Sequence, residues 1–246
     1  MPDRSSDRTR VGVLITRPEP GAAETAIRVA ALGLRPVVAP LLEISALPST
    51  LPAVERLQAL LIASGNALTG LPAEYRGLKL LAVGDASAAR ARAAGFTDVV
   101  SADGDAATLV VLACECCDAA GLALLLAVGR GQSLALVAAL RARHFRVIRR
   151  AVYAATPVPA LPDQAAAALR AGDLRAALFF SAETARQFVR LLIRADLCEA
   201  VRGVDACAIG QPAATAIETL PWRRVLRAAQ PTQDAMLALL RCQPLR

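Results

Sequence analysis

Small and polar residues recur where short apolar runs end, and they are the residues in this chain best suited to chemistry. These turns are Thr16-Arg17, Ser64-Gly65-Asn66, Gly84-Asp85-Ala86-Ser87, Gly129-Arg130-Gly131, Ser181-Ala182-Glu183-Thr184 and Gly210-Gln211. A helical pattern follows each turn, so backbone N–H groups and the positive end of a helix would lie together and attract anions. For any single turn, helix N-capping by Ser64, Ser181 or Thr16 is the favoured alternative. Six turns opening toward one cleft would favour ligand binding.

Other reactive patterns are incomplete. Gly129-Arg-Gly131 begins a dinucleotide fingerprint, but Leu134 stands in place of the third glycine and the expected acidic residue is absent, so we expect no NAD. Cys114, Cys116 and Cys117 lie close together, yet the only histidine is His144. We therefore expect no metal site and no catalytic triad, three small buried cysteines, and His144 in a turn or on the surface.

The elements that position these turns repeat along the chain. The runs 13–17 and 125–130 each precede an Ala-rich helical stretch, and the pair 61–67 and 81–87 corresponds to 178–185 and 208–214. Apolar runs that alternate with helical patterns indicate parallel sheets, and the repeat indicates two similar α/β domains. Strands are expected near 11–15, 35–38, 60–63, 80–83, 98–100, 124–128, 146–148, 177–180, 206–209 and 225–227. Helical spacing covers 23–30, 185–192 and 213–220.

Two Pro-rich segments, 39–48 and 151–162, mark the domain boundaries. Proline disfavours helix in the residue before it, so both segments are expected to be extended and to pair as a two-stranded connector. The first domain would then be discontinuous. The expected ranges are 1–39 and 154–246 for the first domain, 46–148 for the second, and 40–45 and 149–153 for the connector. Two crossings predict a hinge, with domain motion and a ligand site between the domains.

Tyr153 lies in the returning connector segment. Its hydroxyl could reach a bound ligand there. Simple packing of an amphipathic aromatic side chain on the connector is equally compatible with this position.

Composition narrows the class of partner. The chain has 246 residues, 55% of them apolar and 3% aromatic, with a net charge of +7. The charge favours an anionic partner, but few aromatics and scattered arginines argue against nucleic acid. An arginine-rich proteome would produce the same charge. The polar first ten residues and six unpatterned cysteines predict a cytoplasmic protein with reduced thiols. No apolar run is long enough to span a membrane, and we expect a monomer.

Taken in order, these motifs resemble the uroporphyrinogen-III synthase family from Val11 to about Leu240. The segments that carry the resemblance are Leu14–Pro18, Ser64–Ala67, Ala82–Gly84, Ala151–Tyr153, Phe179–Ser181, Ala208–Gly210 and Pro231-Thr232. The resemblance implies two α/β domains joined by a two-stranded connector.

It also implies a reaction on hydroxymethylbilane, a linear tetrapyrrole with eight carboxylates. Loss of the terminal hydroxyl gives an azafulvene, and attack by the last ring at its substituted carbon gives a spiro intermediate. This intermediate fragments and recloses with the ring inverted, forming uroporphyrinogen III. Such catalysis depends mainly on orientation, and the resemblance implies no cofactor.

Roles follow from the resemblance at matching positions. Tyr153 would assist departure of the hydroxyl as a hydrogen-bond donor or general acid. Thr16, Arg17, Ser64, Ser87 and Ser181 would hold substrate carboxylates. The remaining turn residues complete the expected binding set: Gly65, Asn66, Arg130, Ala182, Gly210 and Gln211.

One departure leaves other functions open. The family commonly has hydroxyl residues after Gly210, where this chain has Pro212 and Ala213. Fewer donors there would weaken carboxylate binding. A degenerate, non-catalytic homologue that binds an anionic ligand or regulates a partner is therefore the second hypothesis. Nucleic-acid binding rests on net charge alone.

Overall fold

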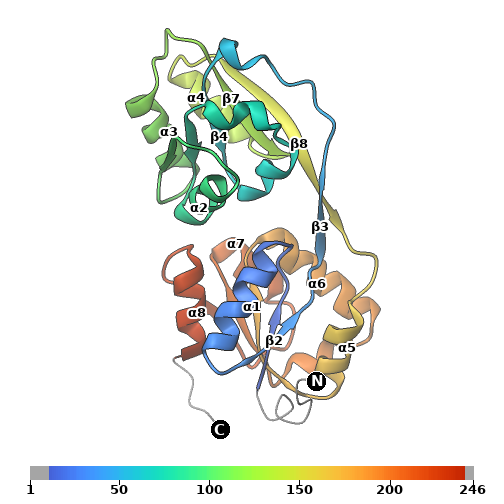
Figure 1. Cartoon of the computed structure of the whole chain (residues 1–246). Helices are drawn as coiled ribbons and strands as arrows, with labels where there is room; N and C mark the ends of the chain where they lie inside the picture. Colours follow the sequence, from blue (N-terminus) through green and yellow to red (C-terminus); the bar gives the residue numbers. More distant parts are fainter. Residues whose placement is uncertain (1–10, 242–246) are drawn as a thin grey trace, which may run out of the picture. The chain divides into compact units, whose positions relative to one another are not determined.

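Parallel strands with helices between them form two sheets in the computed structural model, which describes residues 11–241 (Figure 1). The chain divides into two compact units. Unit 1 contains the chain up to Glu43 and from Thr156 onward, and unit 2 is Ile44–Ala155. The expected fold class, two parallel-sheet α/β domains of which the first is discontinuous, is confirmed.

Unit 1 is a five-stranded sheet in the order β11-β10-β9-β1-β2 with helices on both faces. Its elements are β1 (Gly12–Ile15), α1 (Gly21–Ala31), β2 (Arg35–Val38), α5 (Asp163–Arg170), β9 (Leu174–Phe179), α6 (Ala182–Arg194), η4 (Cys198–Val201), β10 (Asp205–Ala208), α7 (Gln211–Ile217), β11 (Arg224–Arg227) and α8 (Gln233–Arg241). Helices α1 and α8 pack on one face of the sheet, and α5, α6 and α7 pack on the other. The central strands β9, β10 and β1 are mostly apolar because both faces of the sheet are covered, and their charged residues, Arg175 and Asp205, lie near the amino ends of β9 and β10.

Unit 2 has a six-stranded sheet in the order β3-β8-β7-β4-β5-β6. Its elements are β3 (Leu42–Ala46), η1 (Val54–Arg56), β4 (Leu57–Ile62), η2 (Gly65–Gly70), η3 (Ala73–Gly77), β5 (Leu80–Ala82), α2 (Asp85–Ala93), β6 (Val99–Ser101), α3 (Ala106–Cys116), β7 (Ala123–Gly129), α4 (Leu134–Ala142) and β8 (Val147–Pro157). One face is covered by η2, η3 and α2, and the other by α3 and α4.

The two sheets repeat one strand arrangement with a permuted chain order. Strands β1, β2, β9, β10 and β11 of unit 1 occupy the places that β7, β8, β4, β5 and β6 occupy in unit 2. The equivalent strand pairs β1–β2 and β7–β8 differ in their place along the chain. In unit 1 the pair β1–β2 comes before the other three strands, whereas in unit 2 the pair β7–β8 comes after them. The chain changes direction across each sheet between two central strands, which are β1 and β9 in unit 1 and β4 and β7 in unit 2.

Strands β3 and β8 form the two-stranded connector. Leu47 N–H donates to the Val152 carbonyl at 2.9 Å and Val158 N–H donates to the Leu41 carbonyl at 3.1 Å, so the two segments run antiparallel. The sequence placed a short strand at 146–148 and a separate connector after it. Instead β8 is one long strand from Val147 to Pro157, because it contains no glycine and its only proline is the last residue.

The end of α7 differs from the sequence-based expectation, whereas the position of His144 agrees with it. The helical pattern expected over 213–220 ends at Ile217, since Leu220 precedes Pro221 and that position disfavours helix. Leu220 is nevertheless buried. His144 is exposed, and its φ of 67° matches the left-handed φ of 77° at Gly33, each residue lying just after a helix. The turn or surface position expected for His144 is confirmed.

The expectation of three buried cysteines is wrong for Cys114, which lies exposed on α3. Cys116 and Cys117 are half-buried against the core on that side of the sheet. Burial, with a smaller effect from Cys116, raises the pKa of Cys117 to about 11, which disfavours the thiolate that metal binding requires. Across residues 11–241, no three His, Cys, Asp or Glu side chains are grouped so as to hold a metal ion.

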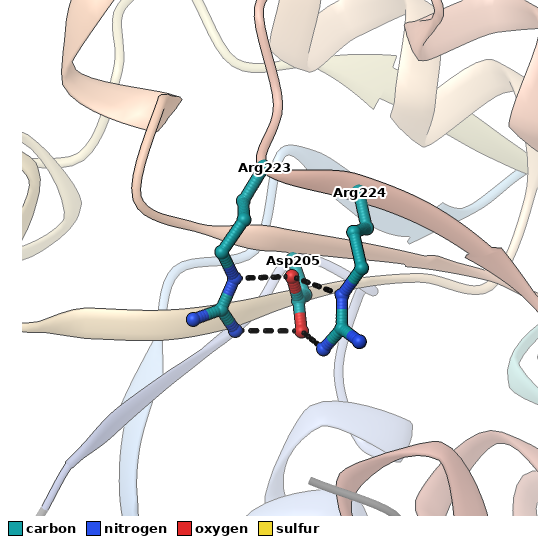
Figure 2. A network of polar contacts seen from close by, with 3 residues as sticks. All are labelled: Asp205, Arg223 and Arg224. Carbon is teal, nitrogen blue, oxygen red and sulfur yellow. Dashed lines mark hydrogen bonds and ion pairs between the residues drawn. The ribbon is translucent and has the colours of Figure 1, made fainter. Parts of the chain in front are cut away.

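An ion-pair network lies at the amino ends of β10 and β11 (Figure 2). The carboxylate of Asp205 is fully buried and accepts two hydrogen bonds from Arg223, both at 2.7 Å. Arg224 donates to the same carboxylate at 2.6 and 3.2 Å. Burial alone would raise the pKa of Asp205, but the two arginines outweigh it and hold that pKa below its usual range.

No helix within the described range is both long and apolar enough to cross a membrane.

Candidate active site

The turns selected from the sequence follow the carboxyl ends of parallel strands in both units. Thr16, Ser181 and Gly210 follow β1, β9 and β10 in unit 1. In sheets of this type ligands bind outside the carboxyl ends of the strands, at the point where the strand order reverses. That point lies between β1 and β9 in unit 1 and between β4 and β7 in unit 2. The structure thus brings the candidate residues of each unit to one edge of its sheet.

Thr16 joins the two strands that flank the reversal point in unit 1. Its side chain is fully buried, and its hydroxyl donates to the Leu178 carbonyl of β9 at 2.7 Å. This bond fixes the end of β1 against the end of β9. The hydroxyl proton of Thr16 is therefore used within the protein.

Arg17 brings a positive charge to the same edge. Its guanidinium carbon lies 4.4 Å from the ring centroid of Phe180, a cation–π distance. Nη1 of Arg17 also donates to Thr25 and Gln233, each at 3.2 Å. These contacts hold the half-buried guanidinium beside the turns that follow β1 and β9.

Ser181 caps α6. Its Oγ accepts the Thr184 N–H at 3.1 Å and lies 2.8 Å from the Thr184 hydroxyl. Ala182 is the first residue of α6, where backbone N–H groups have no partner within the helix. Capping, the alternative role considered for Ser181, is what this geometry shows.

The turn after β10 offers fewer donors. Gly210 is the N-cap of α7, and Pro212 in the first turn has no N–H. Gln211 is exposed and accepts from Nη1 of Arg227 at 2.8 Å. Arg227 ends β11, so a second cation of unit 1 lies at this edge.

In unit 2 the turn after β4 combines a cap with an arginine. Ser64 accepts the Asn66 N–H at 3.3 Å and caps η2. Nη1 of Arg90, from α2, donates to Oδ1 of Asn66 at 3.3 Å. A Cβ added to Gly65 would lie 2.9 Å from the same Nη1 atom, so the glycine lets the guanidinium lie over the turn. Ser87, one turn before Arg90 on α2, is half-buried.

Tyr153 lies opposite Gly129 in the β7–β8 pair and is only 3% exposed. Its ring packs into the core on the η2 and α2 side of the sheet. The hydroxyl donates to Oε1 of Gln132 at 3.0 Å, in the turn that follows β7. Arg130, in the same turn, has an exposed side chain, and its N–H donates to the Tyr153 carbonyl at 2.9 Å.

Three residues of these edges were missed from the sequence, namely Arg90, Arg227 and Gln132. Arg90 and Arg227 meet their turns only through the folded sheet, and the charge pattern alone gives no signal for them. Gln132 had one available signal, because it is a polar residue directly after the selected turn Gly129-Arg130-Gly131.

Each sheet edge therefore combines first-turn N–H groups with arginine. Arg17 and Arg227 supply the charge in unit 1, and Arg90 and Arg130 supply it in unit 2. Such combinations bind carboxylates well. Unit 2 adds a phenol hydroxyl, the one group among these able to donate a proton to a leaving group.

Comparisons with known proteins point to one family. A family model described as Uroporphyrinogen-III synthase HemD matches residues 23–238. The structure of uroporphyrinogen-III synthetase from Helicobacter pylori is similar, with a TM-score of 0.61 and 16% identity over 94% of this chain and 98% of that chain. A mutant uroporphyrinogen III synthase from the extremely thermophilic bacterium Thermus thermophilus has 19% identity over 94% of this chain and 98% of that chain, with a TM-score of 0.49. The curated protein sequences contain no match.

Proposed function

Because the chain belongs to the uroporphyrinogen-III synthase family, we propose that it cyclises hydroxymethylbilane to uroporphyrinogen III with inversion of the last pyrrole ring. The observation that carries this proposal is the Tyr153 hydroxyl, held by Gln132 at the turn after β7. The arginines at the sheet edges supply the complementary charge for a substrate with many carboxylates.

Binding comes first in the proposed reaction. Arg17, Arg90, Arg130 and Arg227 pair with substrate carboxylates, and the first turns of α6 and η2 add N–H donors. A chain held at several points has few conformations left. The enzyme thereby favours the geometry in which the last ring attacks at its substituted carbon.

Tyr153 then assists the departure of hydroxide. The phenol proton moves to the hydroxyl oxygen of the substrate and the C–O bond breaks, which gives water, a phenolate and the protonated, cationic azafulvene. Ring closure later releases one proton from the substrate, which restores the phenol. The overall change is loss of one water. An ordinary phenol is a weak acid with a pKa near about 10, so its position matters more than its acidity.

A second candidate function is anion binding without chemistry, as a degenerate homologue. The proline in the first turn of α7 and the capping roles of Ser64 and Ser181 favour it, because these groups are less available to a substrate. Localisation in the cytoplasm and a monomeric state remain predictions for either function.

The test is the product. Purified protein would be incubated with freshly prepared hydroxymethylbilane, and the oxidised isomers I and III would be separated by chromatography. Predominant isomer III supports the synthase proposal. Isomer I alone, formed at the spontaneous rate, would overturn it, and calorimetric titration with uroporphyrinogen III would then test the binding function.

A further inference from the structure

We infer that Gln132 is a positioning residue for Tyr153, acting on the reaction only through the phenol hydroxyl. The inference rests on the proposed function and extends it to a residue of the same turn. Its first support is the 3.0 Å hydrogen bond from the Tyr153 hydroxyl to Oε1 of Gln132. Because Tyr153 is only 3% exposed, packing holds its ring in place, and the hydroxyl is the part of the side chain that can change its hydrogen bond.

The backbone of Gln132 is fixed from both neighbouring strands. Its N–H donates to the Gly129 carbonyl at the end of β7 at 3.1 Å. Its carbonyl accepts from Nε of Arg149 on β8 at 2.9 Å. The next residue, Ser133, has a left-handed φ of 64° and is the N-cap of α4. The amide of Gln132 is therefore presented to the phenol from a defined position.

Gly129 shows that the contact is built into the turn. A Cβ added there would lie 2.7 Å from Oε1 of Gln132 and 2.9 Å from Cζ of Tyr153. The φ angle of Gly129 is not positive, so the backbone conformation does not require a glycine here. The close approach of the Gln132 and Tyr153 side chains does. The absent side chain leaves room for the two polar groups to meet.

The amide can serve both protonation states of the phenol. With its oxygen toward Tyr153, it accepts a hydrogen bond from the phenol and holds the ring in place. Rotation of the amide would turn Nε2–H toward the phenol oxygen, releasing the proton to the substrate and stabilising the negative charge that develops.

A double-mutant cycle tests the inference, with the rate of type III product as the readout. Spontaneous closure does not form that isomer. We expect Gln132→Leu to lower kcat about tenfold, the effect of one lost hydrogen bond, with KM unchanged. In a Tyr153→Phe background, Gln132→Leu should lower kcat no further, because Gln132 has no hydroxyl left to position.

Gln58→Leu is the matched control. Gln58 lies in the same unit, near the amino end of β4 and so at the opposite end of that strand from the selected turn, and it donates to the Asp118 carbonyl at 2.8 Å. Its loss should leave kcat unchanged. An unchanged kcat in Gln132→Leu would overturn the inference. So would an equal loss of kcat when Gln132→Leu is made in the unaltered chain and in Tyr153→Phe. In either case, type III formation by the unaltered chain would still uphold the proposed function. Absence of type III product from the unaltered chain would overturn both.

Discussion

The reversal points of the two units share one topology but are completed by different side chains. In unit 1 the Thr16 hydroxyl binds β1 to β9, and Arg17 stacks on Phe180. In unit 2 the equivalent strand end is Gly129, with Tyr153 and Gln132 over it. A side chain that joins strands leaves a rigid, charged edge suited to binding. A glycine leaves room for a phenol. The same strand arrangement therefore carries a strand-joining hydroxyl in one copy and a buried phenol in the other.

The amino ends of the sheets differ in the same manner. Lys79, just before β5, pairs with Asp98, just before β6, at 3.1 Å, and both side chains are at least one-third exposed. Register places Asp205 and Arg224 at the equivalent positions of unit 1, so the two charges are exchanged. Only the unit 1 carboxylate is fully buried, and it gains a second arginine, Arg223.

The largest expected effect is the loss of kcat when the Tyr153 hydroxyl of unit 2 is removed. Tyr153→Phe should lower kcat about 100-fold, the lower range for a lost general acid. The free energy of unfolding should change by only about 1 kcal/mol, because one hydrogen bond is lost. Type III formation under steady-state conditions measures the first quantity, and urea denaturation measures the second.

Tyr75→Phe is the matched control in the same unit. Tyr75 is the only other tyrosine, it is buried, and its hydroxyl donates to the Pro52 carbonyl. The two variants should lose similar stability. Equal losses of kcat in both variants would remove the special role of Tyr153 and, with it, the difference in chemistry between the two strand ends.

The next effect sharpens the contrast between the ion pairs. Asp205→Asn should destabilise the protein by about 2 kcal/mol, since it leaves two arginines facing each other beside a buried amide. Nearly half of each arginine side chain is exposed, so solvent screening keeps the loss below that of a fully buried pair. Asp98→Asn should change stability by about 0.5 kcal/mol or less. Urea midpoints for the two variants measure the difference, and equal midpoints would contradict it.

The low pKa of Asp205 also predicts a pH dependence. A carboxyl whose pKa is lower in the folded state stabilises the fold above its unfolded pKa, about 3.9, and that contribution is lost as pH falls through the folded value. The stability gap between the unaltered chain and Asp205→Asn should therefore be constant near neutral pH and narrow below about pH 4. A gap that does not narrow in acid would show that the carboxylate charge is unimportant.

A smaller effect is expected on binding at the unit 2 edge. Arg90→Gln should raise KM about tenfold with kcat unchanged, because a charged hydrogen bond to substrate is lost equally in the ground and transition states. Arg92→Gln is the control, since Arg92 lies on the same helix but donates to the Val99 carbonyl at 2.8 Å. Its KM should stay at the original value. A fall in kcat for Arg90→Gln would place Arg90 in the chemistry and blur the comparison.

The smallest effect separates capping from carboxylate binding. Ser181→Ala should destabilise unit 1 by about 1 kcal/mol through the lost cap of α6. Ser64→Ala should matter less, because its 3.3 Å bond caps the short η2 segment. Thermal denaturation gives both values. If Ser181→Ala instead raised KM without changing stability, its hydroxyl would belong to the substrate site.

The fold was largely predictable because fully covered parallel strands read as apolar runs that end at turn residues. The run Ala123–Gly129, buried at every position, illustrates this. Strand ends were less predictable, as β8 shows, since pairing with β3 and β7 extends it beyond the short strand expected at 146–148. Contacts between elements gave no signal. Arg90 and Asn66 are 24 residues apart, and Tyr153 and Gln132 are 21 apart. Tyr153 was selected from the sequence, yet its burial and its partner emerge only from the folded sheet.

The central claim is that this chain inverts the last ring by means of Tyr153. The most direct test adds increasing amounts of protein to a fixed amount of hydroxymethylbilane and measures the ratio of isomer III to isomer I. Enzymatic closure competes with spontaneous closure, so the type III fraction should rise toward one as the protein concentration increases. Tyr153→Phe should need about 100-fold more protein to reach the same ratio. If isomer I remained the only product at every protein concentration, the claim would be contradicted.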